Sequence, residues 1–172
     1  MPDPLTVRVV DVADGDTFTA AGSSGNTITV RVWGIDAPES GQPYGPAATK
    51  VARRIIGGEL VNVYVQDTGP YGRHIARVRC TYDGEEVGLA RSLCISGLAW
   101  HSRRYGTSET LVAHEKQARS EEAGLWSQAD PVPPWEYRDA KGETGLLEAI
   151  GDGIDTAQKG LRWGRWIGRL FS

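Results

Sequence analysis

The chain has 172 residues, of which 40% are hydrophobic and 24% are charged, and its formal net charge is −3. This composition fits one globular domain of roughly 100–150 residues with an additional segment, and it excludes a largely disordered chain. The negative balance excludes a protein that binds a polyanion through bulk positive charge, so a nucleic-acid site would have to be local.

The cysteines and the N-terminus give no sign of a zinc site or of a signal peptide. Cys80 and Cys94 have no Cys or His partners at metal-ligand spacing, and we expect two free thiols in the core. Residues 1–5 lack a basic region followed by an apolar one. We therefore expect a cytoplasmic protein or a mature form whose signal has been removed. No apolar run approaches the roughly 20 residues of a membrane span.

In chain order, the hydrophobic pattern predicts mainly strands first and helices later. Strands are expected where β-branched residues dominate or apolar and polar residues alternate, at 5–12, 17–21, 27–35, 59–66 and 74–82. Helices are expected where an apolar face is followed by a glycine, at 47–56, 87–96 and 109–123. Ser108 is suited to cap the third helix. This order predicts an α+β, mainly β fold: a five-stranded OB-type barrel with three packed helices. A ferredoxin-like sandwich is the alternative.

The C-terminal quarter differs in character from the domain expected at 1–127. Residues 128–145 begin with a Pro-rich stretch and are predicted to form a linker, or an arm laid on the barrel with Trp135 as its anchor. Residues 146–172 carry apolar residues and arginines on different helical faces, which predicts a separate amphipathic helix. Three partners are possible for this helix. It could dock on its own domain or on another protein, lie on an anionic membrane surface, or help to hold nucleic acid.

Three short segments contain residue types suited to phosphodiester chemistry: Asp14–Thr17, Arg31–Glu39 and Tyr71–Arg73. Asp16 and Asp36 lie at the ends of neighbouring predicted strands, and a hard divalent cation prefers such carboxylate ligands. A guanidinium group can donate to two oxygens of one phosphate at the same time. A further carboxylate near the cation can activate a water molecule. Each segment alone is weak evidence for this chemistry, and the evidence comes from the presence of all three in this order along the chain.

Together, these segments resemble the staphylococcal nuclease family of calcium-dependent phosphodiesterases. The correspondence runs from about Val7 to Trp126 and includes Tyr44–Pro46, Gly97–Ala99 and Gly124–Ser127. We expect the protein to be a monomer. The resemblance implies an OB-fold nuclease that acts on DNA and RNA with Ca²⁺ as its cofactor. It also implies that single strands are cut to products with 3′-phosphate ends.

The resemblance also implies roles for individual residues. The Ca²⁺ ligands would be Asp16, Asp36 and the backbone carbonyl of Ala37, which stands where the family commonly has threonine. The catalytic residues would be Arg31, Glu39 and Arg73, with the arginines holding the phosphate and Glu39 acting on the attacking water. Asp14, two residues before Asp16, is expected to face the same side and to orient water molecules on the metal.

Substrate contacts are expected next to this site, at Tyr71, Trp100, Arg103 and Arg104. Trp100 could stack on a base, or it could pack on the third predicted helix. A catalytically silent OB-fold adaptor for nucleic acid or protein is the functional alternative. The intact set of acidic and basic residues favours the enzyme.

Overall fold

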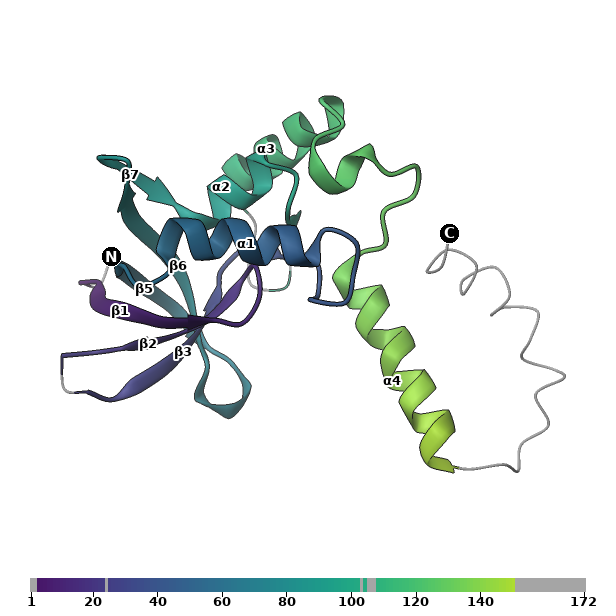
Figure 1. The fold of residues 1–172 in the computed structure, drawn as a ribbon, viewed down its shortest axis with the longest axis horizontal. Coiled ribbons are helices and arrows are strands. Elements are labelled where there is room, and N and C mark those ends of the chain that lie inside the picture. The colour runs from purple at the N-terminus through teal and green to yellow at the C-terminus, as the bar shows by residue number, and fades with distance from the viewer. Residues whose placement is uncertain (1–2, 24, 103, 105–107, 151–172) are drawn as a thin grey trace, which may run out of the picture. The chain divides into compact units, whose positions relative to one another are not determined.

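The computed structural model describes residues 3–23, 25–102, 104 and 108–150, with side chains described as far as residue 142 (Figure 1). The chain divides into two compact units, and the second begins at Arg138. Residue 103 and most of the predicted C-terminal helix, residues 151–172, lie outside the described residues. None of the described helices is long and apolar enough to cross a membrane.

Five strands of the first unit form a closed barrel, in the order β3-β2-β1-β5-β6. They are β1 (Leu5–Val12), β2 (Thr17–Ala21), β3 (Thr27–Val32), β5 (Leu60–Thr68) and β6 (His74–Tyr82). Neighbouring strands are antiparallel except at the closing pair, where β3 and β6 run parallel and Arg31 lies opposite Ile75. The predicted five-stranded OB-type barrel is confirmed, and the ferredoxin-like alternative is wrong.

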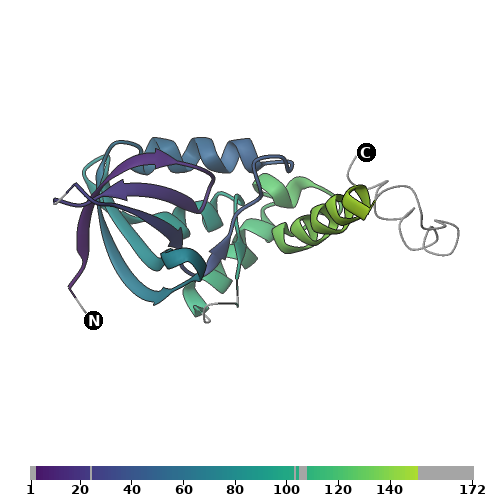
Figure 2. The same cartoon turned by 90° about the horizontal axis from the view of Figure 1, so that it is seen from below.

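Helices cover the barrel and share its core. They are α1 (Gly45–Ile56), α2 (Leu89–Ile95) and α3 (Glu109–Ser120). Figure 2 shows α1 running beside the strands, and its buried Ala48 and Ala52 belong to the same apolar cluster as Phe18 and Val30. The three predicted helices are confirmed. Ser108 caps α3 as expected, since its hydroxyl accepts a hydrogen bond from the Leu111 N–H.

Three short strands carry too little periodicity to be predicted. β7 (Glu85–Gly88) extends the sheet beyond β6. β4 (Ile35–Asp36) and β8 (Trp100–His101) pair with each other outside the barrel, with Asp36 opposite Trp100. Trp100 then packs in a second apolar cluster with Ala118 and Trp126. The unit also contains the single helical turns η1 (Pro70–Gly72) and η3 (Gly124–Ser127).

The last helix begins earlier than the sequence indicated. α4 (Pro134–Ile150) starts inside the segment that was predicted to be a linker as far as residue 145. Proline is well suited to the first turn of a helix, because its missing N–H has no partner there in any case. Tyr137 then donates its N–H to the carbonyl of Pro133. Only residues 128–133 of the predicted linker therefore lie outside a helix.

Gly15 allows the turn before β2 to pack directly on two other elements. A Cβ at this position would lie 2.8 Å from the Cβ of Ala37 and 2.8 Å from the Cβ of Ala48 in α1. Neither methyl group can rotate away, because alanine has no side-chain torsion that moves its Cβ. We expect Gly15→Ala to lower the free energy of unfolding by about 1–3 kcal/mol, measured by denaturant unfolding.

Gly22→Ala is the matched control for that measurement. The Cβ that it adds would meet only the Asn26 carbonyl oxygen, at an ordinary contact distance of 3.9 Å. A loss of stability as large as that of Gly15→Ala would show that close packing at Gly15 is not the cause.

Candidate active site

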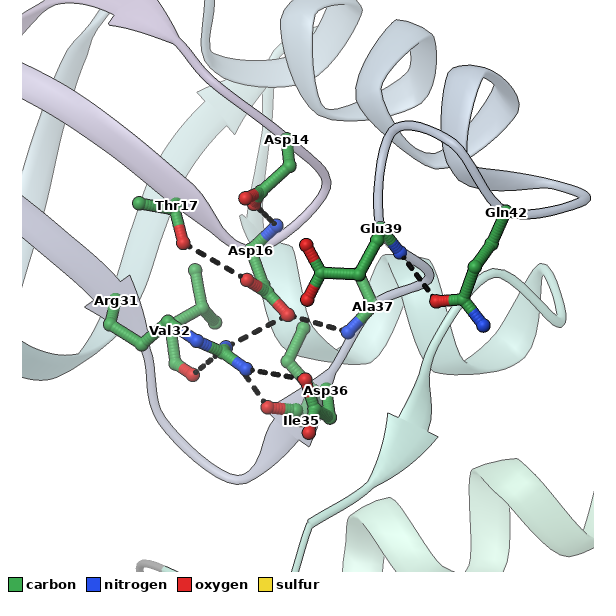
Figure 3. A network of polar contacts seen from close by, with 10 residues as sticks. All are labelled: Asp14, Asp16, Thr17, Arg31, Val32, Ile35, Asp36, Ala37, Glu39 and Gln42. Atoms are coloured by element: carbon green, nitrogen blue, oxygen red, sulfur yellow. Dashed lines mark hydrogen bonds and ion pairs between the residues drawn. The ribbon is translucent and has the colours of Figure 1, made fainter. Parts of the chain in front are cut away.

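One guanidinium joins two buried carboxylates on the outside of the barrel (Figure 3). The Nη1 atom of Arg31 lies 2.9 Å from Oδ2 of Asp16, and its Nη2 atom lies 2.8 Å from Oδ1 of Asp36. Their exposed fractions are 7% for Arg31, 4% for Asp16 and 6% for Asp36. The sequence prediction that the two aspartates lie close together is consistent with this geometry.

Strand register and one turn assemble this group. Thr17, the first residue of β2, pairs with Arg31 of β3, which brings Arg31 beside Asp16. The N–H of Val32 donates to the carbonyl of Asp16 at 2.8 Å and fixes this register. A turn at Gly34, whose φ is +81°, then returns the chain so that Asp36 reaches the same guanidinium. Glycine adopts this positive φ without the steric cost of a Cβ.

Further hydrogen bonds hold Asp16 and Arg31 in place. Oδ2 of Asp16 accepts from the Ala37 N–H at 2.5 Å, and Oδ1 accepts from the Thr17 hydroxyl at 3.1 Å. The Nη1 group of Arg31 also donates to the carbonyls of Val32 and Ile35. The guanidinium predicted to hold phosphate is thus directed mainly at protein acceptors in this structure.

Asp14 contributes to the turn itself. Its Oδ1 atom accepts a hydrogen bond from the Asp16 N–H at 3.0 Å, as aspartates commonly do two residues before a backbone donor. This bond orients the backbone that carries Asp16. The predicted role of Asp14, orienting water on a metal, stays a prediction.

The group has two buried carboxyl groups for one guanidinium. Burial raises the pKa of Asp16 to about 8, and the nearby carboxylates of Asp14 and Asp36 act in the same direction. Arg31 and the Ala37 N–H lower this pKa but offset only part of the effect. A cation bound beside Asp16 would favour its ionised form and lower this pKa.

Glu39 lies at the edge of this group, on the loop that leads to α1. It is half-buried, and Figure 3 shows its carboxylate turned toward Asp16. The Glu39 N–H donates to Oε1 of Gln42 at 2.8 Å. Gly45 lies so close to the Glu39 carbonyl that a Cβ there would overlap it. Gln42 could not be identified from the sequence, because a glutamine in a Pro- and Gly-rich loop carries no periodic signal.

Arg73 lies just before β6, the strand that pairs with the strand of Arg31, and outside the carboxylate group. The pairing of Arg31 with Ile75 places Arg73 and Arg31 on the same face of the sheet by the alternation of side chains. Its Nε–H is buried and has no hydrogen-bond acceptor among the described residues. An N–H in this state is suited to an acceptor that a ligand brings. Tyr71, in η1, is fully exposed.

The other predicted substrate contacts are Trp100, Arg103 and Arg104. Trp100 is 8% exposed, and its ring meets that of Trp126 edge to face at 4.3 Å. Trp100 packs against Ala118 of α3, as in the second of its two predicted roles. Little of its ring is therefore accessible to a base. Arg104 is exposed, and Arg103 lies outside the described residues. A cavity of about 340 Å³ lies beside Trp100 and Trp135, and the carboxylates do not line it.

The carboxylate group would form an open cation site with few protein ligands. Among the residues that the structure describes, there is no group of three or more His, Cys, Asp or Glu side chains that could hold a metal. The donors available are the oxygens of Asp16 and Asp36, with backbone carbonyls such as that of Ala37. Ca²⁺ takes 6–8 oxygen ligands, so water or a phosphate would have to provide most of them. The oxygen donors are compatible with such an ion.

Comparisons with known proteins agree with this geometry. The family model described as "Staphylococcal nuclease homologue" matches residues 29–128, a range that includes Arg31, Asp36, Glu39 and Arg73 but not Asp16. An "Uncharacterized endonuclease" of Escherichia coli O157:H7 is 36% identical over 134 residues, which cover 78% of this chain and 85% of the relative.

Two further relatives have similar names. A "Micrococcal nuclease" of Shigella flexneri is 35% identical over 140 residues, which cover 77% of this chain and 80% of the relative. A probable staphylococcal-like nuclease of Oryza sativa subsp. japonica is 39% identical over 109 residues, which cover 63% and 32% of the two chains. With its closed barrel and its acidic group around Arg31, the chain belongs to the staphylococcal nuclease family.

Proposed function

We propose that this protein is a Ca²⁺-dependent nuclease that hydrolyses phosphodiester bonds of DNA and RNA. Single strands would be the preferred substrate, and the products would carry 3′-phosphate ends. The observation that supports this most strongly is the buried Asp16–Arg31–Asp36 group with the Glu39 carboxylate turned toward it. The names of the relatives, endonuclease and micrococcal nuclease, point to the same chemistry.

The cation would be held by Asp16, Asp36 and the carbonyl of Ala37. When bound there, Ca²⁺ supplies positive charge that offsets the carboxylates and polarises a phosphate oxygen. The two buried carboxyl groups that share a single guanidinium support this assignment. The positive charge of a bound Ca²⁺ would also allow an acidic protein to act on a polyanion.

The remaining chemistry is assigned to Glu39 and the two arginines. Glu39 accepts a proton from a water molecule whose oxygen forms a bond to phosphorus. The P–O5′ bond then breaks, the 5′ oxygen takes up a proton, and the phosphate stays on the 3′ oxygen. Arg73, with its Nε–H lacking an acceptor in the described structure, donates to the phosphate, and Arg31 adds positive charge beside it. Donors of this kind lower the energy of the charged five-coordinate transition state.

Cleavage of a labelled single-stranded DNA tests the cation assignment. Wild type is expected to cut in Ca²⁺ and to leave the substrate intact in EDTA. Asp36→Asn removes one of the two buried charges while keeping the side-chain shape. This variant should need a higher Ca²⁺ concentration to reach its half-maximal rate. The increase should be at least roughly 10–100-fold, which is the usual cost of losing a residue that only hydrogen-bonds to a metal ligand.

Asp11→Asn is the control, because Asp11 is an exposed aspartate of β1. Equal cleavage in Ca²⁺ and EDTA would overturn the cation assignment. An intact substrate in both would overturn the nuclease proposal and favour the silent adaptor.

A further inference from the structure

Gln42 holds the backbone of Glu39 through two separate hydrogen bonds. Its side-chain Oε1 accepts from the Glu39 N–H at 2.8 Å, and its own N–H donates to the Glu39 carbonyl at 2.8 Å. The Gln42 carbonyl in turn accepts from the N–H of Gly45, the first residue of α1. The loop between Glu39 and α1 is therefore closed on itself, with Gln42 at its centre.

The other end of the Gln42 side chain reaches a distant part of the sequence. Its Nε2 atom donates to the carbonyl of Val132 at 3.2 Å, across 90 positions of the chain. Gln42 is only 4% exposed, so water has little access to either bond. Val132 lies beyond residue 128, where the family match ends.

The segment that carries Val132 is fixed to the domain on both sides. We call residues 128–135 the strap. Just before it, the Ser127 hydroxyl lies 2.8 Å from the Tyr44 hydroxyl, on the residue that precedes α1. At its end Pro134 is fully buried, and the ring of Trp135 meets that of Trp100 edge to face at 5.7 Å. Trp100 is itself the β-partner of Asp36.

We propose that Gln42 is a positioning residue for Glu39, and that the strap holds Glu39 in its working position through the Gln42 amide. The inference rests on the proposed role of Glu39 as the group that activates water. A glutamine suits this place because its amide provides one acceptor and two donors on a single planar group. A carboxylate at position 42 would keep the acceptor for Glu39 and would set a negative oxygen against the Val132 carbonyl. An apolar side chain would lose both bonds.

The position of Glu39 matters because proton transfer requires hydrogen-bond geometry. A displacement of about 1 Å at a catalytic group can cost on the order of 100-fold in rate. Loss of the strap is therefore expected to lower kcat and to leave substrate and Ca²⁺ binding nearly unchanged, because neither Gln42 nor Trp135 bonds to the two aspartates. The strap would make a segment outside the family match part of the catalytic apparatus.

The test uses full-length Gln42→Met, Gln42→Glu and Trp135→Ala, with Gln66→Met as a matched control. Gln66 is an exposed glutamine of β5 whose amide donates to the nearby Tyr64 carbonyl. On single-stranded DNA in Ca²⁺, kcat should fall roughly 10–100-fold for Gln42→Met and Trp135→Ala. KM should change by less than about twofold, which is the signature of a lost transition-state interaction. Gln42→Glu keeps the acceptor for Glu39 but loses the bond to Val132, so it should slow kcat about as much as Trp135→Ala, and Trp135→Phe should keep most of the rate.

Two further readouts separate positioning from general destabilisation. The double variant Gln42→Met/Trp135→Ala should be no slower than the slower single variant, since both break the same connection. Hydrogen exchange at the Glu39 amide should accelerate in both single variants and stay unchanged in Gln66→Met, whatever the activity.

Each outcome has a distinct meaning. Unchanged hydrogen exchange at the Glu39 amide in Gln42→Met and Trp135→Ala would overturn the proposal that the strap holds Glu39. Faster exchange with an unchanged kcat would overturn the positioning role. An inactive wild type would overturn the proposed function and with it the catalytic role of Gln42, while the exchange data would still decide whether the strap holds the loop.

Discussion

Glu39→Gln is expected to lower kcat on single-stranded DNA by about 10²–10⁴-fold, the range for loss of a general base. The substitution keeps the size and polarity of the side chain and removes only its ability to accept a proton as a carboxylate. The bond from the Glu39 N–H to Gln42 belongs to the backbone and remains. The free energy of unfolding should therefore stay unchanged, and KM should change little.

The comparison for this variant is Glu59→Gln, which neutralises an exposed glutamate that precedes β5. Both variants lower the negative charge of the protein by one, so a change in overall electrostatic attraction would affect them alike. If Glu59→Gln were as slow as Glu39→Gln, or if Glu39→Gln cut as fast as wild type, Glu39 would not be the base.

Arg31→Met should lower the free energy of unfolding by about 3–5 kcal/mol, the usual cost of removing one partner of a buried ion pair. Methionine fills similar space but leaves Asp16 and Asp36 without the guanidinium that lies within 3 Å of each. The carbonyls of Val32 and Ile35 lose a donor at the same time. Denaturant unfolding should be measured in EDTA, so that a bound cation does not replace the lost charge.

An exposed ion pair of the same barrel provides the control. Arg79 and Glu86 approach to 2.6 Å, and more than half of each side chain is exposed. Arg79→Met should cost less than about 1 kcal/mol, as is typical of surface pairs. If Arg31→Met and Arg79→Met lowered the free energy of unfolding by similar amounts, burial would not make the Arg31 ion pairs more important for stability than an exposed pair.

The barrel could be predicted because each of its strands repeats a simple pattern over several residues. β3, for example, alternates Thr27, Thr29 and Arg31 with apolar residues, and the apolar set faces the core. β4 and β8 have two residues each, which is too short for any period. They pair only because the turn at Gly34 and the end of α2 bring them together, and neither event can be deduced from local pattern.

The site was predictable in its residue types but not in its bonds. The order of acidic and basic residues singles out Asp16, Arg31, Asp36 and Glu39, because few other chemistries use this set. Which acceptors Arg31 meets depends on the register of β2 with β3, and the structure directs it to Asp16 and Asp36. Whether Arg31 also contacts phosphate stays a prediction.

Contacts across long sequence separations were the least predictable part. Gln42 meets Val132 over 90 positions, and nothing in either segment alone indicates the other. Trp100 could be assigned to a base or to the core on sequence grounds, and only the positions of Trp126 and Trp135 show that it packs with other indoles. The start of α4 at Pro134 was missed because consecutive prolines also suit an extended linker.

Mass spectrometry of the products in isotopically labelled water tests most directly whether these residues form a Ca²⁺-dependent hydrolytic site. A single-stranded oligodeoxynucleotide would be incubated with the protein in H₂¹⁸O containing Ca²⁺, and in parallel with EDTA. The proposal predicts fragments with a 5′-hydroxyl and a 3′-phosphate that carries one ¹⁸O atom, formed only with Ca²⁺. An intact oligonucleotide in Ca²⁺, or fragments whose phosphate lies on the 5′ end, would contradict it.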